Sequence, residues 1–208
     1  MTYATIPYIA HTHDFYDIVL LPDPVLKTKA SAVSAVDDTI RTQMDRMLAT
    51  MYEAHGIGLA ANQVGVLNRV IVMDVEQRRV EDDDCGHHGC GHVHTIMVPG
   101  KPLAMANPEI TWSSEERRLY REGCLSIPEQ YAEVERPASV RVKYVDYNGQ
   151  AQEILAEGLL ATCIQHEIDH LNGIMFTDHI SRLKRDTLLR KLVKYKKENE
   201  IVDDRLVL

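Results

Sequence analysis

The chain has 208 residues and a formal net charge of −8, with 45% hydrophobic and 26% charged residues. This balance is typical of a folded globular protein and excludes a disordered or fibrous chain. No stretch approaches the roughly 20 apolar residues that span a bilayer, and the N-terminus lacks the basic segment of a secretory signal. We therefore expect a cytoplasmic protein without a membrane partner, in which the four cysteines are thiols or metal ligands rather than disulfides.

A helix is predicted directly after Asp37 and Asp38, in the stretch "TIRTQMDRMLATMYEAH". Its apolar residues recur at helical spacing, from Ile40 to Met51, and Gly56 lies just beyond the predicted end. Further along, "NRVIVMDV" (68–75) is typical of a buried strand.

The segment 81–95 has an unusual composition and is predicted to be a surface insertion. Histidines, cysteines and glycines are concentrated there, which makes the segment a candidate for a second, weaker metal site. The alternative is a flexible polar loop, because the spacing matches no common structural zinc site. The candidate ligands are Cys85, His87, Cys90 and His92.

The C-terminal half begins with the clearest hairpin pattern of the sequence. Val140, Val142 and Tyr144 alternate with polar residues and are followed by the Asn148-Gly149 turn and a return strand. Helices are predicted over 158–171 and over 181–200, the second with Ser181 as N-cap. Because strands come in pairs and helices lie near the ends, we expect an α+β fold in one domain over 1–208.

Charge is distributed unevenly along the chain. Residues 182–197 carry eight basic residues and one acidic one, for +7, so the other residues sum to −15. The net negative charge of the residues outside 182–197 argues against DNA binding by the whole surface. The basic helix is nevertheless a candidate contact for an anionic partner such as the ribosome.

The stretch "CIQHEIDHLNGIMF" (163–176) indicates a metal site on a helix. His166 and His170 are four residues apart, so both imidazoles lie on one helical face. Glu167 points about 100° away and can act as a general base beside the metal without binding it. The alternative is a solvated helix that carries the HExxH pattern by accident.

A catalytic metal needs a third ligand. Cys163 is too far from His170, because about 10.5 Å of helix rise separates them; it is better interpreted as a pocket or core residue. Asp178 and Asp186 are available downstream, although nothing around them marks a ligand. Cys124, in "YREGCLSIP", is the favoured candidate, and its alternative role is that of a small buried apolar residue.

Three motifs together resemble those of the peptide deformylases. They are "GIGLAANQ" (56–63), "EGCLS" (122–126) and "QHEIDH" (165–170), in the family's order and spacing. The resemblance covers about residues 18–200. It implies small antiparallel or mixed sheets around a central metal-binding helix, with a helix at the C-terminus.

The resemblance also implies a reaction, the removal of the formyl group from N-formyl-methionine at the start of new polypeptides, with release of formate. By position, Cys124, His166 and His170 would hold the metal, and a metal-bound water would be the nucleophile. Glu167 would be the general base and acid. The Gln63 side-chain amide and the backbone N–H of Leu125 would donate hydrogen bonds to the oxyanion.

The family pattern further assigns a substrate pocket. Its candidate residues are Ile57, Gly58, Tyr120, Gly123, Leu159 and Cys163. Four positions depart from the common pattern. They are His55 where an acidic residue is frequent, Tyr120 and Thr162 where aliphatic residues are frequent, and Tyr131 in place of an arginine. We expect these differences to affect subsite preference rather than the chemistry.

One divalent metal is expected. The family implies Fe2+, the donor set alone favours Zn2+, and Ni2+ or Co2+ could also bind. The sequence leaves two alternative functions, a zinc peptidase that cleaves internal amides and a non-catalytic metal-binding protein. Phe176, where a metzincin would have its third histidine, argues against the first. The presence of Gln63, Cys124 and Glu167 argues against the second.

Overall fold

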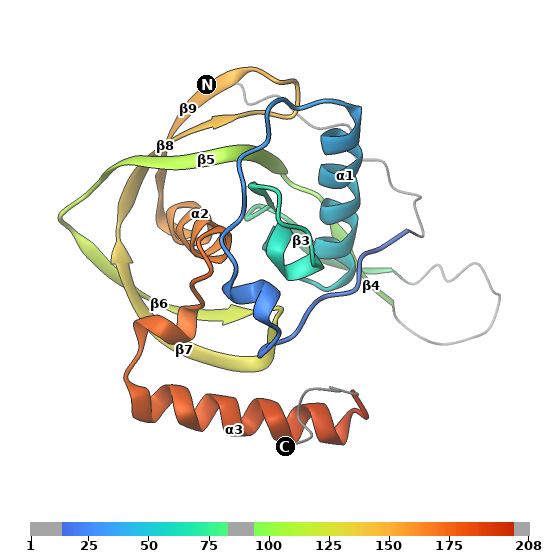
Figure 1. Cartoon of the computed structure of the whole chain (residues 1–208), viewed down its shortest axis with the longest axis vertical. Helices are drawn as coiled ribbons and strands as arrows, with labels where there is room; N and C mark the ends of the chain where they lie inside the picture. The colour runs from blue at the N-terminus through green and yellow to red at the C-terminus, as the bar shows by residue number, and fades with distance from the viewer. Residues whose placement is uncertain (1–13, 83–93, 202–208) are drawn as a thin grey trace.

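The computed structural model describes residues 14–82 and 94–201. Three α-helices and three short 3-10 helices accompany nine strands in this described part (Figure 1). The helices are α1 (Asp38–Glu53), α2 (Gly158–Leu171), α3 (Arg182–Glu198), η1 (Pro24–Lys27), η2 (Ala61–Val64) and η3 (Phe176–His179). The strands are β1 (Gly58–Ala60), β2 (Val70–Met73), β3 (Arg78–Asp82), β4 (His94–Val98), β5 (Leu103–Ser113), β6 (Arg117–Cys124), β7 (Ile127–Pro137), β8 (Ser139–Val145) and β9 (Ala151–Glu157).

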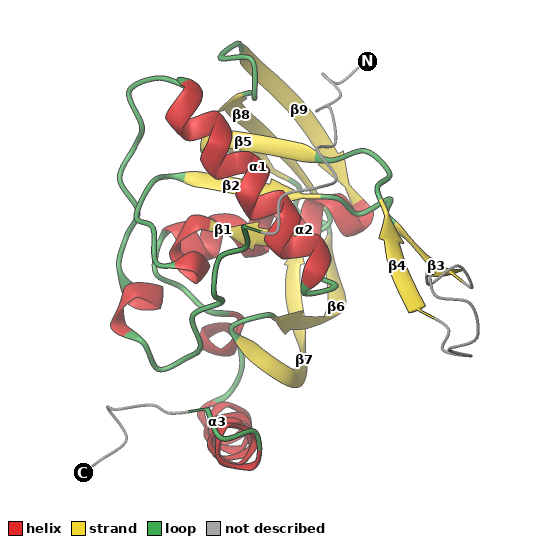
Figure 2. Ribbon diagram, turned by 90° about the vertical axis from the view of Figure 1, so that its right-hand side faces the viewer, coloured by secondary structure: helices red, strands yellow, loops and turns green. Residues whose placement is uncertain are grey.

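The main sheet is antiparallel, in the order β1-β2-β5-β8-β9, and carries a helix on each face. On β2, Ile71 and Met73 pack with α2, whereas Val70 and Val72 pack with α1. Figure 2 shows α1 lying across one face of this sheet. Because β2 is buried on both faces, its sequence is a continuous apolar run rather than an alternating one.

A two-stranded ribbon, β6–β7, lies outside the main sheet. Ile127 and Val134 of β7 form a third apolar cluster with Phe176 and with Leu188 and Leu192 of α3. The C-terminal helix is therefore attached to the body through the ribbon that carries Cys124 (Figure 1).

The structure confirms the α+β class and the main predicted elements. Asp37 caps α1 by accepting the Ile40 N–H at 2.9 Å. Val140, Val142 and Tyr144 face inward on β8, which pairs with β9 across the turn at Gly149. Ser181 accepts the Lys184 N–H at the start of α3.

Other expectations need correction or remain open. The strand predicted over 68–75 is shorter, at Val70–Met73. The strands β5, β6 and β7 were not predicted; register shifts in β5 interrupt the alternation of the pattern. The two ends of the segment 81–95 lie in β3 and β4, which pair antiparallel (Figure 2). Residues 83–93 lie outside the described part, so the surface insertion stays a prediction. The single domain over 1–208 thus stays a prediction. No helix in the described ranges has the length and apolar character that a membrane span requires.

Candidate active site

Helix α2 brings two histidines to one point. His166 and His170 are buried one turn apart, and their Nε2 atoms are 3.2 Å from each other. Cys124 is the last residue of β6, before the turn at Leu125 and Ser126, and its Sγ lies 3.2 Å from His170 Nε2. The three candidate ligand atoms all fall within 4.8 Å of one another.

These three side chains fit a divalent metal. His166 Nδ1 lies 2.8 Å from a Glu122 carboxylate oxygen, so Nδ1 carries the proton and Nε2 presents a lone pair. Burial lowers the pKa of His170 well below its usual range, which favours the neutral imidazole that a metal binds. Ligand atoms around a tetrahedral metal are about 3.3–3.8 Å apart at ordinary bond lengths. Two of the three separations here, from His170 Nε2 to Cys124 Sγ and to His166 Nε2, are 3.2 Å.

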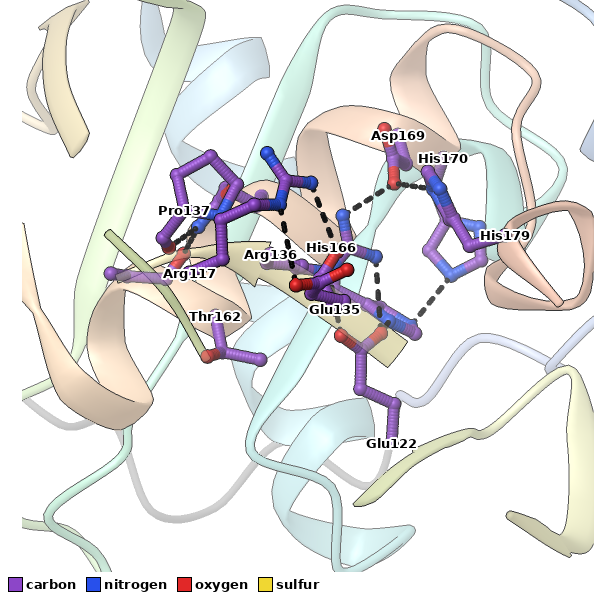
Figure 3. Close-up of polar contacts among 12 residues, drawn as sticks. Arg117, Glu122, Glu135, Arg136, Pro137, Thr162, His166, Asp169, His170 and His179 are labelled. Atoms are coloured by element: carbon purple, nitrogen blue, oxygen red, sulfur yellow. Dashed lines mark hydrogen bonds and ion pairs between the residues drawn. The ribbon is translucent and has the colours of Figure 1, made fainter. Parts of the chain in front are cut away.

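A buried ionic network orients His166. Arg136 of β7 donates to both carboxylate oxygens of Glu122, at 2.6 and 3.0 Å, and to Asp169 at 2.8 Å (Figure 3). Asp169 in turn lies 2.7 Å from the ring of His179. Burial alone would raise the pKa of Glu122, but the hydrogen bonds from His166 and Arg136 lower it to about 2. Glu122 is therefore a permanent anion that holds the His166 ring in place.

Gln63 points its amide toward the same cluster. Its Oε1 accepts the Ala60 N–H at 2.8 Å, which fixes the side chain orientation. Its Nε2 lies 3.4 Å from Cys124 Sγ and 3.3 Å from Ser126 Oγ. A hydrogen-bond donor is thus held beside the candidate metal ligands.

Glu167 is buried next to the cluster, and its Oε2 has no hydrogen-bond partner among the described residues. Burial raises the pKa of Glu167 to about 7. Gly58 packs directly on this side chain: a Cβ at position 58 would lie 2.7 Å from Cys163 Sγ and closer still to Glu167 Oε1. The absence of a side chain at Gly58 therefore gives the carboxylate its space.

A cavity of about 480 Å³ opens beside the cluster. All the pocket residues predicted from the family pattern line this cavity. Ile57 and Leu159 are 39% and 42% exposed, whereas Cys163 is 4% exposed and directs its Sγ at the Ile57 carbonyl. The predicted residues that line it are Ile57, Gly58, Tyr120, Gly123, Leu159 and Cys163.

The structure separates the candidate ligands from their alternatives. The Asp178 carboxylate accepts hydrogen bonds from Lys27 and from the Met175 N–H. Asp186 forms an ion pair with Arg182. Neither aspartate belongs to the cluster of candidate ligands. Cys163 is also outside it. Cys85, His87, Cys90 and His92 lie outside the described residues, and the second metal site stays a prediction.

Two contributors were missed in the sequence. Arg136 gave no signal, because its role depends on the pairing of β7 with β6, where it lies near Glu122. Ser126, buried beside Gln63, belongs to the motif "EGCLS" but was assigned no role of its own.

Comparison with known proteins identifies the family. The profile of the polypeptide deformylases matches residues 15–186. A peptide deformylase of Methylocella silvestris is 54% identical over 177 residues, covering 85% of this chain and 83% of the relative. One of Rhizobium meliloti is 50% identical, covering 85% and 91%.

Solved structures agree with the sequence comparison. A crystal structure of a peptide deformylase from Ehrlichia chaffeensis in complex with actinonin has a TM-score of 0.74 at 39% identity, covering 88% of this chain and 98% of that one. A structure from Legionella pneumophila has a TM-score of 0.75 at 38% identity, covering 91% and 99%. The chain therefore belongs to the peptide deformylase family.

Proposed function

We propose that this protein removes the formyl group from N-formyl-methionine at the N-terminus of newly made polypeptides in the cytoplasm and releases formate. The observation that carries the proposal is the convergence of Cys124, His166 and His170, with the unpartnered Glu167 oxygen beside them at the cavity wall. Family membership supplies the reaction class, and this arrangement supplies the groups that the reaction needs.

Cys124, His166 and His170 would hold one divalent metal, Fe2+ in the cell, with Zn2+, Ni2+ or Co2+ as alternatives that the same donors accept. When bound, such an ion lowers the pKa of a coordinated water and polarises a carbonyl. The Glu122–Arg136 pair keeps the His166 ring in the orientation that presents Nε2 to the site.

Glu167 would move the proton. A carboxylate with a pKa of about 7 can take a proton from the attacking water and deliver it to the leaving amine of methionine, because both forms are populated near neutral pH. The buried surroundings that raise this pKa also keep bulk water from competing for the proton.

Two donors would stabilise the tetrahedral oxyanion. The Gln63 amide is already aimed at the cluster, and the Leu125 N–H belongs to the turn that follows Cys124. Removal of one such donor typically costs about 3–4 kcal/mol in the transition state.

The methionine side chain would occupy the apolar cavity between Ile57, Leu159 and Cys163. The peptide backbone would lie between two strands. β1 is the end strand of the main sheet, and β6 pairs only with β7 within the described ranges. Residues 120–124 all line the cavity, as expected of a strand that presents its edge, so an extended peptide could pair with both strands.

The basic face of α3 would contact the ribosome. Leu188 and Leu192 of this helix are buried against the body, whereas Lys184, Arg190 and Lys191 are exposed. None of these three takes part in an ion pair within residues 14–82 and 94–201. Such uncompensated cations are available to phosphates.

Charge substitution tests this contact better than truncation, because removal of α3 would also remove Leu188 and Leu192 from the core. Replacing Lys184, Arg190 and Lys191 by glutamine should weaken co-sedimentation with ribosomes, and added salt should weaken it further. Arg117, Arg118 and Arg141, exposed on strands, provide a control that removes the same number of positive charges. Equal binding by both variants would exclude the contact.

The function itself is tested by formate release from a formyl-Met-Ala peptide, with cleavage of internal amide bonds measured in parallel. We expect formate and an intact des-formyl peptide. Internal cleavage would favour the zinc peptidase alternative, and bound metal without either reaction would favour a non-catalytic protein.

A further inference from the structure

Arg121 lines the cavity and has no anionic partner among the described residues. It is exposed on β6 and lines the cavity together with Tyr131. Its guanidinium lies over the Tyr131 ring, 4.7 Å from the ring centre. None of the ion pairs formed within residues 14–82 and 94–201 includes it, although Glu133 lies opposite in the β6–β7 register.

The position of this cation is fixed by its neighbours. Tyr131 pairs with Gly123 across the ribbon, and a Cβ at Gly123 would lie 2.6 Å from the tyrosine ring. Because Gly123 has no side chain, the Tyr131 ring packs directly on its backbone. The Arg121 guanidinium stacks on this ring. A stacked guanidinium loses less freedom when it binds a carboxylate than a freely moving one would.

Arg121 also lies at a defined distance from the reacting centre. Strand β6 rises about 3.3 Å per residue, which puts Arg121 about 7 Å from Gly123 and about 10 Å from Cys124 along the strand. An extended peptide beside β6 advances by the same step. If the peptide runs antiparallel to β6, away from Cys124, and its methionine is level with Gly123, its third residue is level with Arg121.

We propose that the Arg121–Tyr131 pair is a specificity determinant that favours substrates with an acidic side chain at the third residue. This inference rests on the proposed function, since it assigns a preference to the same cavity. The ligand chemistry is a carboxylate, which a guanidinium binds with two parallel hydrogen bonds. The second and fourth residues fall about 3.3 Å to either side and should respond less.

The test compares kcat/KM for formyl-Met-Ala-X-Ala peptides with amidated C-termini, where X is Glu, Gln or Lys. Because an exposed ion pair contributes little, we expect a Glu-to-Gln ratio of about two to five at low salt, a Lys value below that of Gln, and a ratio that falls with added salt. Arg121→Gln should bring the ratio to one, and Tyr131→Leu should lower it. Arg117→Gln, four residues earlier on the same strand and outside the cavity lining, should leave the ratio unchanged.

The outcomes separate this inference from the function on which it rests. Formate release from the Gln peptide with a Glu-to-Gln ratio of one overturns the inference alone. A ratio that survives Arg121→Gln, or that falls equally in Arg117→Gln, also overturns it. Absence of formate from every peptide contradicts the proposed function instead.

Discussion

Replacement of Arg136 by methionine should destabilise the protein strongly. The side chains of Arg136 and Glu122 are 6% and 4% exposed, and Arg136 also neutralises Asp169. Removing one partner of a buried ion pair leaves the other charge buried without compensation, which lowers the free energy of unfolding by about 3–5 kcal/mol. For a protein of this size, each kcal/mol lowers Tm by about 2–4 °C, so a fall on the order of 10 °C is expected.

The free energy of unfolding is measured by urea titration in the presence of a metal chelator, so that a difference in bound metal does not contribute to it. Arg141→Met is the control, because Arg141 and Glu153 form an exposed pair at 3.3 Å, a contact worth at most about 1 kcal/mol. Adding Glu122→Gln to Arg136→Met should recover part of the loss, since it removes the stranded charge. A cost for Arg136→Met equal to that of Arg141→Met would refute the network as a stabilising element.

Three further predictions concern single sites. Cys124→Ala should lose bound metal, whereas Cys163→Ala should retain it, because only Cys124 belongs to the cluster; metal analysis of the purified variants decides. Gly58→Ala should cost about 1–3 kcal/mol by overpacking and should reduce turnover, since the added methyl meets Glu167; normal kinetics would contradict this. Burial would raise the pKa of Asp178, but Lys27 and the Met175 N–H lower it. Its stabilisation is thus present above the ordinary pKa of 3.8 and is lost as pH falls through the lowered folded value. Asp178→Asn should therefore destabilise at neutral pH, and the difference from wild type should shrink in acid; a difference independent of pH would contradict the assignment.

Local patterns predicted those parts of the molecule that depend on neighbouring residues. The helical spacing of His166 and His170 was sufficient to place two imidazoles together, and the alternation from Val140 to Tyr144 was sufficient to predict β8. Cys124 was identified by resemblance to a family motif, because 42 residues separate it from His166 and no local pattern joins them.

Contacts that depend on strand register or on the packing of a helix against a strand could not be predicted. Arg136 meets Glu122 only because β7 folds back on β6, and Asp169 meets Arg136 only because α2 packs beside that ribbon. The Arg121–Tyr131 pair has the same origin, since the register that puts Tyr131 over Gly123 is set by the turn after Cys124.

The central claim is that Glu167 transfers the proton beside a three-ligand metal centre. Glu167→Gln tests it most directly, because the amide occupies nearly the same volume but cannot accept the proton. Metal content and formate release should be measured on the same preparation. We expect full metal occupancy with turnover reduced about 10²–10⁴-fold. Full occupancy with a loss below threefold would contradict the account.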